Sequence, residues 1–337
     1  MLNLLSDIPG LAVGHATDLV LGSGVTAILF DDPTVASVAM TGGAPGERDT
    51  AALAPGATVE RVDAIVLSGG SSFGLDAASG VQAVLRAAGR GFALGAARVP
   101  IVAQAILFDL LNGGDKAWGR YPPYRELGER AAQRAAAGAF DLGSVGAGTG
   151  ATTATLKGGL GSASEITRSG HRVGAIVAVN ALGSATIGDG PHFWSAPFER
   201  DGEFGGRGWP ARFSDAERAP RTKFAPGGAT TIGLVVTDAV LTKPQAYRLA
   251  IMAHDGLARA ILPAHAPLDG DTMFAAATCR RPLAEPMREL TELGHAATLA
   301  VARAIARGVF EAVALPVPDA QPAWRDRFAA PAPARLR

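Results

Sequence analysis

Short apolar runs rich in β-branched residues recur along this chain and limit the folds open to it. Residues 25–30 (VTAILF), 35–40 (VASVAM) and 62–68 (VDAIVLS) lie between Gly, Asp and Pro residues, a pattern typical of buried strands. Residues 175–180 (AIVAVN) and 230–241 (TTIGLVVTDAVL) have the same character. The first third of the chain is therefore expected to be rich in strands, with further strands later.

Four segments instead place their apolar residues at helical spacing and are predicted helices. They are residues 75–89, 124–138, 242–262 and 287–313. Strands and helices that alternate indicate an α/β protein, but a strand-dense beginning and two late helices do not fit a regular βαβ series. A sandwich of sheets with the helices outside is favoured.

Glycine is frequent, with 43 residues scattered in short clusters. The glycine-rich stretch 143–164 is predicted to be a loop in which backbone segments approach closely. Residues 188–228 are crowded with Gly, Pro and charge, and form the one internal segment that resembles a linker. The Ala- and Pro-rich tail, residues 318–337, is predicted to be disordered, and the rest is treated as one domain.

The charge balance and the cysteine content exclude several classes of protein. Thirty-one basic residues balance 31 acidic ones, so no overall field attracts nucleic acid or acidic membranes. The single Cys279 cannot form an internal disulfide, and no Cys/His cluster has zinc spacing. With no recognisable signal peptide, a cytoplasmic protein without metal or cofactor is expected.

The junction at GGATT, where the linker-like segment meets a buried strand, is the most informative position. A Thr hydroxyl is a weak nucleophile, but a Thr at a new N-terminus has its own α-amine as a base. Gly227 and Gly228 would let the backbone bring the Thr230 hydroxyl onto the Ala229 carbonyl. Self-cleavage between Ala229 and Thr230 is one interpretation; a β-branched strand start at Thr230 and Thr231 is the other.

A second nucleophile candidate lies in GSSFG, which matches the G-x-S-x-G elbow with Ser72 at its centre. An elbow needs a later acid and then a histidine. That order is available from Asp238 or Asp269 with His254, His265 or His295. The alternative is a glycine turn in which Ser71 and Ser72 cap the next helix.

Two polar features could support either nucleophile. Asp269 and Asp271 share one tight turn, where paired carboxylates could orient an amine or a lysine, or could simply cap the turn. Asn180 ends an apolar run and could donate a hydrogen bond to an oxyanion, or could only terminate its strand.

Whole phrases of the chain are similar to one family. They are DIPGLAVGHATD, GGAPGERDT, VDAIVLSGGSSFGLDAASGV, VPIVAQAILFDL, GAGTGAT, KGGLGSAS, ATTIGLVVTDA and HAPLDGDTMFA. From about Ser6 to Ala314 the chain resembles the L-aminopeptidase/D-esterase family, which includes β-peptidyl aminopeptidases and the nylon-oligomer endo-hydrolase.

The resemblance implies a four-layer α/β/β/α sandwich of the aminopeptidase/ornithine-acetyltransferase type. It also implies self-cleavage into an α chain, 1–229, and a β chain, 230–337, that stay together, commonly as a tetramer of such pairs. Aligned on TTIGLVVTDA, the family nucleophile falls on Thr230. By the same motifs Asn180 resembles the oxyanion donor, and Asp269 and Asp271 resemble the acidic pair that orients the nucleophile and its amine.

The sequence departs from relatives at three positions. They often have Asn where Ala229 stands. Relatives of the nylon-hydrolase type have a site Lys at Thr155 and a site Tyr at Phe108. Lys157 lies two residues from Thr155, so in an extended segment it would share that face, and on another loop path it would be solvated.

The function predicted from these features is hydrolysis of small peptides, amides or esters through an acyl-enzyme on Thr230. Three alternatives stay open: a Ser72 serine esterase, a self-processing acyltransferase of the ornithine-acetyltransferase type, and an unprocessed oligomer that only binds.

Overall fold

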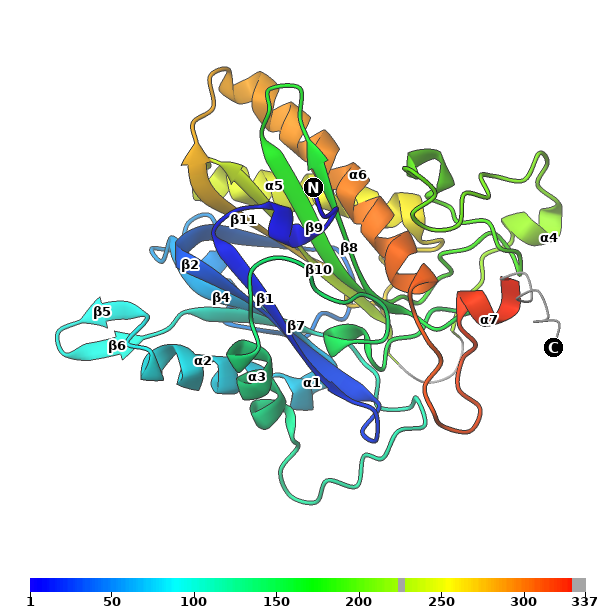
Figure 1. Cartoon of the computed structure of the whole chain (residues 1–337), viewed down its shortest axis with the longest axis horizontal. Coiled ribbons are helices and arrows are strands. Elements are labelled where there is room, and N and C mark those ends of the chain that lie inside the picture. The colour runs from blue at the N-terminus through cyan, green and yellow to red at the C-terminus, as the bar shows by residue number, and fades with distance from the viewer. Residues whose placement is uncertain (224–227, 329–337) are drawn as a thin grey trace, which may run out of the picture.

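One mixed sheet forms the centre of the molecule (Figure 1). The computed structural model describes residues 1–223 and 228–328, and within them the sheet has nine strands in the order β3-β7-β4-β2-β11-β10-β9-β8, with β1 paired to β2. The strands are β1 Leu11–Asp18, β2 Ser23–Met40, β3 Glu47–Arg48, β4 Arg61–Ser68, β7 Val102–Ile106, β8 Gly159–Ile166, β9 Arg172–Asn180, β10 Thr230–Ala239 and β11 Thr272–Arg281. A separate hairpin comprises β5 Phe92–Leu94 and β6 Ala97–Val99.

The longer helices lie on two opposite sides of the strands (Figure 1). The helices of the described residues are α1 Ser71–Gly74, α2 Ala77–Ala87, α3 Tyr124–Gln133, α4 Asp215–Arg218, α5 Lys243–Ala260, α6 Pro286–Phe310 and α7 Trp324–Phe328. Four short 3₁₀ turns are η1 Leu5–Asp7, η2 Thr50–Leu53, η3 Gly146–Gly148 and η4 Ala196–Phe198. The four helices predicted from periodicity are confirmed as α2, α3, α5 and α6.

Two interpretations of local pattern were wrong. The runs 25–30 and 35–40 belong to one strand, β2, whose first half pairs with β1 and β4 and whose second half pairs with β11. Its register against β4 shifts between Leu29 and Thr34, which is where the sequence suggested a break. The predicted loop 143–164 ends in strand β8, because the glycines there allow α6 to pack against the strand backbone.

Three apolar clusters hold the layers together. One lies between α5 and α6 and the strands β8 to β11, and a second lies between α2 and α3 and the strands β2, β4 and β7. The third lies among the strands themselves. In β10, Leu234 and Val236 enter the third cluster while Val235 enters the first, as the two-residue period of a strand requires.

Described parts of the predicted linker, residues 188–228, and of the predicted tail, residues 318–337, pack against each other and against α6. Phe193 and Phe204 are both 2% exposed, and Phe193 stacks on Trp324 with ring centroids 5.8 Å apart. Trp324 begins α7 and is 3% exposed, so the expectation of disorder was wrong for residues 318–328. The remainder of that tail, 329–337, lies outside the described residues, as do residues 224–227 of the segment before the junction.

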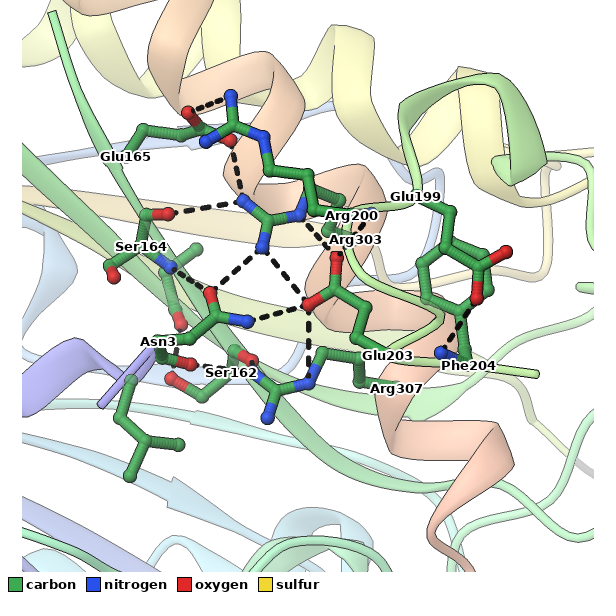
Figure 2. Close-up of polar contacts among 12 residues, drawn as sticks. Asn3, Ser162, Ser164, Glu165, Glu199, Arg200, Glu203, Phe204, Arg303 and Arg307 are labelled. Atoms are coloured by element: carbon green, nitrogen blue, oxygen red, sulfur yellow. Dashed lines mark hydrogen bonds and ion pairs between the residues drawn. The ribbon is translucent and has the colours of Figure 1, made fainter. Parts of the chain in front are cut away.

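A buried arginine ties the segment before the junction to the helix after it (Figure 2). Arg303 of α6 is 2% exposed; its Nε lies 2.5 Å from Glu203 Oε1 and its Nη1 lies 2.5 Å from Glu165 Oε1. Its Nη2 donates to Asn3 Oδ1 at 2.9 Å. A buried charge needs several such partners to offset its desolvation. Residues on both sides of the Ala229–Thr230 bond are thus held in one network.

Candidate active site

Thr230 is the first residue of β10 and lies opposite Asn180 of β9 in antiparallel register. Its side chain is buried, and its Oγ1 donates to the carbonyl oxygen of Ala229 at 2.5 Å. The run TTIGLVV fixes this position, because β-branched residues start the strand directly after the glycines. In the intact chain the hydroxyl therefore contacts the carbonyl of its own preceding residue.

A second donor reaches the same carbonyl from the turn before β11. The backbone N–H of Gly270 donates to Ala229 O at 3.0 Å, and Ala229 forms a parallel bridge with Asp269. A Cβ on Gly270 would lie 2.7 Å from Thr230 Oγ1, so the close approach requires glycine. The Gly270 N–H is thus placed to stabilise an oxyanion on this oxygen when Thr230 Oγ1 attacks the carbonyl carbon.

The two carboxylates of this turn have different surroundings. Burial, together with the charge of Asp271, raises the pKa of Asp269 to about 8. Asp269 Oδ1 accepts from Gly270 N at 3.1 Å, while its buried Oδ2 has no hydrogen-bond partner within residues 1–223 and 228–328. Burial opposes ionisation of Asp271 as well, but hydrogen bonds from His265 and from the Thr231 N–H outweigh it and hold its pKa below the usual value.

Asn180 is held by three neighbours. Its Nδ2 donates to the Phe108 carbonyl at 2.8 Å, and its Oδ1 accepts from the Thr152 N–H at 3.0 Å and from Lys223 Nζ at 3.1 Å. Phe108 therefore contributes its carbonyl to the site, and its ring packs against Gly228. These bonds fix the orientation of the Asn180 amide beside Thr230.

Lys223 is the site residue that sequence reasoning missed. Burial lowers the pKa of Lys223 to about 7, although the charge of Asp269 opposes the shift. The only sequence feature that could have indicated it is a lysine six residues before Ala229, in the segment predicted to resemble a linker. Only the return of that segment to the end of β9, where Lys223 N donates to Leu182 O at 3.0 Å, brings it to Asn180.

Lys157 does not reach the position for which the sequence suggested it. It is 1% exposed, and its Nζ donates to the carbonyls of Gly148, Ala151 and Gly158 at 3.0, 2.8 and 2.8 Å. It is thus neither solvated nor directed at Thr230, and it stabilises the glycine-rich loop. Thr155 pairs with Ser184 at 3.2 Å between their hydroxyl oxygens.

A cavity of about 610 Å³ opens beside this arrangement. Phe108, Lys223 and Gly228 line its side nearest the junction, and Asp109, Asn112 and Asp319 are among the other lining residues. The space suits a small ligand with polar groups. Its position next to Gly228 puts such a ligand two residues from Thr230.

The alternative nucleophile lacks the partners it needs. Ser72 lies in α1 and is exposed, and within the described part of the chain its side chain makes no hydrogen bond to a histidine. His254 and His265 both bond Thr41, and His295 is exposed on α6. The strand, turn and helix of an elbow are present, but the proton-transfer partners are elsewhere.

Residues 1–223 and 228–328 contain neither a metal-binding cluster nor a membrane-spanning helix. No three His, Cys, Asp or Glu side chains come together there in a way that could hold a metal ion. No helix in that part combines the length and apolar character needed to span a bilayer.

Known proteins share the fold and the sequence of this chain. The profile of peptidase family S58 matches residues 3–322. The chain belongs to this family. A protein of Mycobacterium tuberculosis described as an uncharacterized aminopeptidase is 40% identical over 97% of this chain and 98% of its own length. The 6-aminohexanoate-oligomer endohydrolase of Agromyces sp. is 29% identical over 81% of this chain and 74% of its own.

Solved structures agree with this S58 assignment at the level of the fold. A Burkholderia sp. beta-aminopeptidase has a TM-score of 0.71 at 21% identity, covering 96% of this chain and 91% of that one. The L-aminopeptidase D-Ala-esterase/amidase of Ochrobactrum anthropi, described as a variant of the Ntn-hydrolase fold, has a TM-score of 0.67 at 21% identity, covering 92% and 86%. The present S58 chain is therefore a hydrolase of the peptidase class with a mixed α/β fold.

Proposed function

We propose that this S58 peptidase cleaves its own chain between Ala229 and Thr230, and that Thr230 then acts as an N-terminal nucleophile on small amides. The observation that carries the proposal is the contact between Thr230 Oγ1 and the Ala229 carbonyl oxygen at 2.5 Å, with the Gly270 N–H on the same oxygen at 3.0 Å. The nucleophile, the carbonyl and an oxyanion donor are thus assembled before any bond breaks.

The self-cleavage step rearranges one bond and then adds water. Thr230 Oγ1 attacks the Ala229 carbonyl carbon, the negative charge develops on the oxygen that Gly270 contacts, and the hydroxyl proton passes to the Thr230 nitrogen. Breakage of the C–N bond leaves an ester between Ala229 and Thr230 with a free α-amine. Water hydrolyses the ester, giving Ala229 a carboxylate and restoring the Thr230 hydroxyl.

The new α-amine supplies the base for later turnovers. It takes the proton of the Thr230 hydroxyl as Oγ1 attacks a substrate carbonyl, returns that proton to the departing amine, and activates the water that hydrolyses the acyl-enzyme. Asp269, whose Oδ2 is buried without a hydrogen-bond partner in the described intact chain, is proposed to be the polar partner of this amine. Asn180 is proposed to contribute its amide to the oxyanion, and Asp271 to hold the start of β10 through the Thr231 N–H.

The proposed substrates are small peptides, amides or esters with a free amino group. The cavity beside Gly228 has the size for such molecules, and relatives are named aminopeptidase and 6-aminohexanoate-oligomer endohydrolase. We also propose the four-layer α/β/β/α arrangement, which is supported by the three apolar clusters of helices and strands. Assembly of the cleaved pairs into a tetramer is part of the same proposal.

Denaturing mass analysis of the purified protein tests the proposal directly. Fragments with the masses of residues 1–229 and 230–337, the second beginning with Thr230, are the expected result. Hydrolysis is then followed with the p-nitroanilides of L-alanine, D-alanine and β-alanine. A folded protein that remains one chain, and releases no p-nitroaniline, would contradict the proposal.

Lys223 provides a prediction within this mechanism. Its ammonium donates to Asn180 Oδ1, and it stands in the site that has lost the family lysine at Thr155. A Lys223→Met variant removes a charge-assisted hydrogen bond of about 1.5–3 kcal/mol, so self-cleavage and kcat are expected to fall about tenfold or more. Time courses of fragment formation and p-nitroanilide kinetics measure both rates.

Arg218→Met is the matched control for Lys223. It removes one positive charge from the same segment, where Arg218 forms an exposed pair with Asp215 at 3.8 Å and no other ion pair within the described residues. Its rates are expected to equal those of the unmodified protein. If Lys223→Met cleaves itself and hydrolyses the p-nitroanilides as fast as Arg218→Met, Lys223 has no role in the proposed site.

A further inference from the structure

A chain of hydrogen bonds leads from Asp271 away from the candidate active site. Asp271 Oδ2 accepts from the His265 backbone N–H at 3.0 Å and lies 2.8 Å from His265 Nδ1. The same Nδ1 lies 2.9 Å from Thr41 Oγ1, which lies 2.9 Å from His254 Nδ1. The other ring nitrogen of His254, Nε2, lies 2.9 Å from the Ala39 carbonyl oxygen.

The Ala39 carbonyl sets the direction of every proton in this chain. A carbonyl oxygen only accepts, so His254 Nε2 carries a proton and donates it. Burial lowers the pKa of His254, so its ring is neutral near pH 7 and its Nδ1 accepts from the Thr41 hydroxyl. The Thr41 oxygen and Asp271 Oδ2 then both face His265 Nδ1 as acceptors, at 2.9 and 2.8 Å. This arrangement selects the tautomer with a proton on Nδ1, which is shared between the two oxygens and donated at the shorter distance to Asp271.

The two carboxylates consequently receive unequal support. Asp271 has donors on both oxygens: the Thr231 N–H on Oδ1 at 2.9 Å, and the His265 N–H and Nδ1–H on Oδ2. Asp269 Oδ1 accepts from Gly270 N, and the Leu182 N–H also favours its charged form, but its Oδ2 has no hydrogen-bond partner in the described residues and burial dominates. Hydrogen bonds to the charged form favour ionisation, so when two adjacent acids share one proton it stays on the less supported one.

We propose that His265 is a positioning residue that keeps Asp271 ionised and leaves the shared proton on Asp269, next to the Ala229–Thr230 bond. The inference rests on the proposed function for its catalytic meaning, but its structural content does not depend on activity. The pair then presents a single negative charge to Thr230. The raised pKa of Asp269 and the lowered pKa of Asp271 agree with this assignment.

Other titratable groups surround the pair and enter the same balance. Lys223 faces Asp269 from the segment before the junction, and Asp255 lies near His254 on α5. Glu47 accepts from Thr272 Oγ1 at 3.3 Å, and burial raises its pKa. Within the described residues none of these three makes a hydrogen bond to the Asp271 carboxylate, so the ring of His265 is the side chain whose removal changes that carboxylate directly.

The test uses two substitutions that suit the backbone conformation of His265, whose φ angle is +56°. Glycine and asparagine both tolerate this left-handed conformation, so neither adds backbone strain. His265→Gly removes the ring, whereas His265→Asn keeps a donor near the position of Nδ1. The side-chain donor is therefore the main difference between the two variants.

The first readout needs no activity. In the uncleavable Thr230→Ala background, urea unfolding is followed at pH 7 and at about pH 2.5. The pKa of Asp271 is held below its usual value, so the stability that its donors provide is present at pH 7 and is lost only as the pH falls through that lowered pKa. His265→Gly is therefore expected to lower the urea midpoint more at pH 7 than at the acid pH. His265→Asn is expected to restore most of the pH 7 loss. Equal losses at both pH values, or equal losses in the two variants, would overturn the inference.

The second readout separates this inference from the proposed function. In the cleaved enzyme the acid limb of kcat/KM begins with protonation of the Thr230 α-amine, and protonation of Asp271 adds a second step at lower pH. His265→Gly is expected to move that lower step to higher pH by about one unit, because Asp271 is then protonated more readily. Thr41→Val, which breaks only the link between the histidines, is expected to move it in the same direction by less. A lower step unmoved in both variants would overturn the inference. Failure of the unmodified protein to cleave itself would contradict the proposed function, and the urea result would still decide the role of His265.

Discussion

A Thr230→Ala variant is expected to remain a single chain of 337 residues and to hydrolyse none of the p-nitroanilides at a measurable rate. Alanine keeps the Cβ that starts β10, so the strand and its register with Asn180 are retained while Oγ1 is lost. Removal of a covalent nucleophile costs at least about 10⁴-fold in rate. The loss is expected both in self-cleavage and in hydrolysis of the p-nitroanilides, because Thr230 Oγ1 is the attacking atom in both reactions.

Two further variants test whether the Thr230 hydroxyl is the group that self-cleavage and hydrolysis require. Thr230→Ser keeps a hydroxyl and is expected to cleave, more slowly, because serine lacks the methyl that restricts χ1. Ser72→Ala is expected to cleave and hydrolyse normally, since Ser72 is exposed and makes no hydrogen bond to a histidine within the described residues. Hydrolysis that survives Thr230→Ala and disappears in Ser72→Ala would reverse the assignment of the nucleophile.

The sequence located the centre of the site because its signals there are local. A buried strand that begins directly after Gly-Gly sets the position of Thr230, and the tight turn DGD sets Asp269 and Asp271 close together. The resemblance to known motifs then linked these separate phrases with Asn180. In the structure they meet, with Asn180 opposite Thr230 and Asp269 bridged to Ala229.

The positions that sequence reasoning missed depend on contacts between distant segments. Lys223 joins the site only because its segment returns to β9, and His265 reaches Asp271 only because the turn adopts a left-handed residue. Trp324 looked like part of a disordered tail until its packing against Phe193 was visible. Periodicity and spacing describe only neighbours in the sequence. They do not predict these contacts, because each contact depends on how the whole sheet is assembled.

Gly270→Ala is the second substitution expected to have a large effect, and its cause is steric. The added Cβ would lie 2.7 Å from Thr230 Oγ1 and 2.8 Å from the Ala44 carbonyl oxygen, so the nucleophile or the turn must move. A displacement on the order of 1 Å at the reacting atoms is expected to slow self-cleavage about 100-fold. Overpacking is also expected to lower the free energy of unfolding by about 1–3 kcal/mol.

Gly56→Ala is the matched control for this steric argument. A Cβ there would meet no atom within 4 Å, and Gly56 is not among the residues with positive φ. The same chemical change at that position is expected to leave cleavage unaltered and to stabilise the fold by about 0.4–1 kcal/mol. Fragment time courses and urea unfolding of both variants measure the two effects. Normal cleavage in Gly270→Ala would mean that the close approach of Gly270 to Thr230 is not required for self-cleavage.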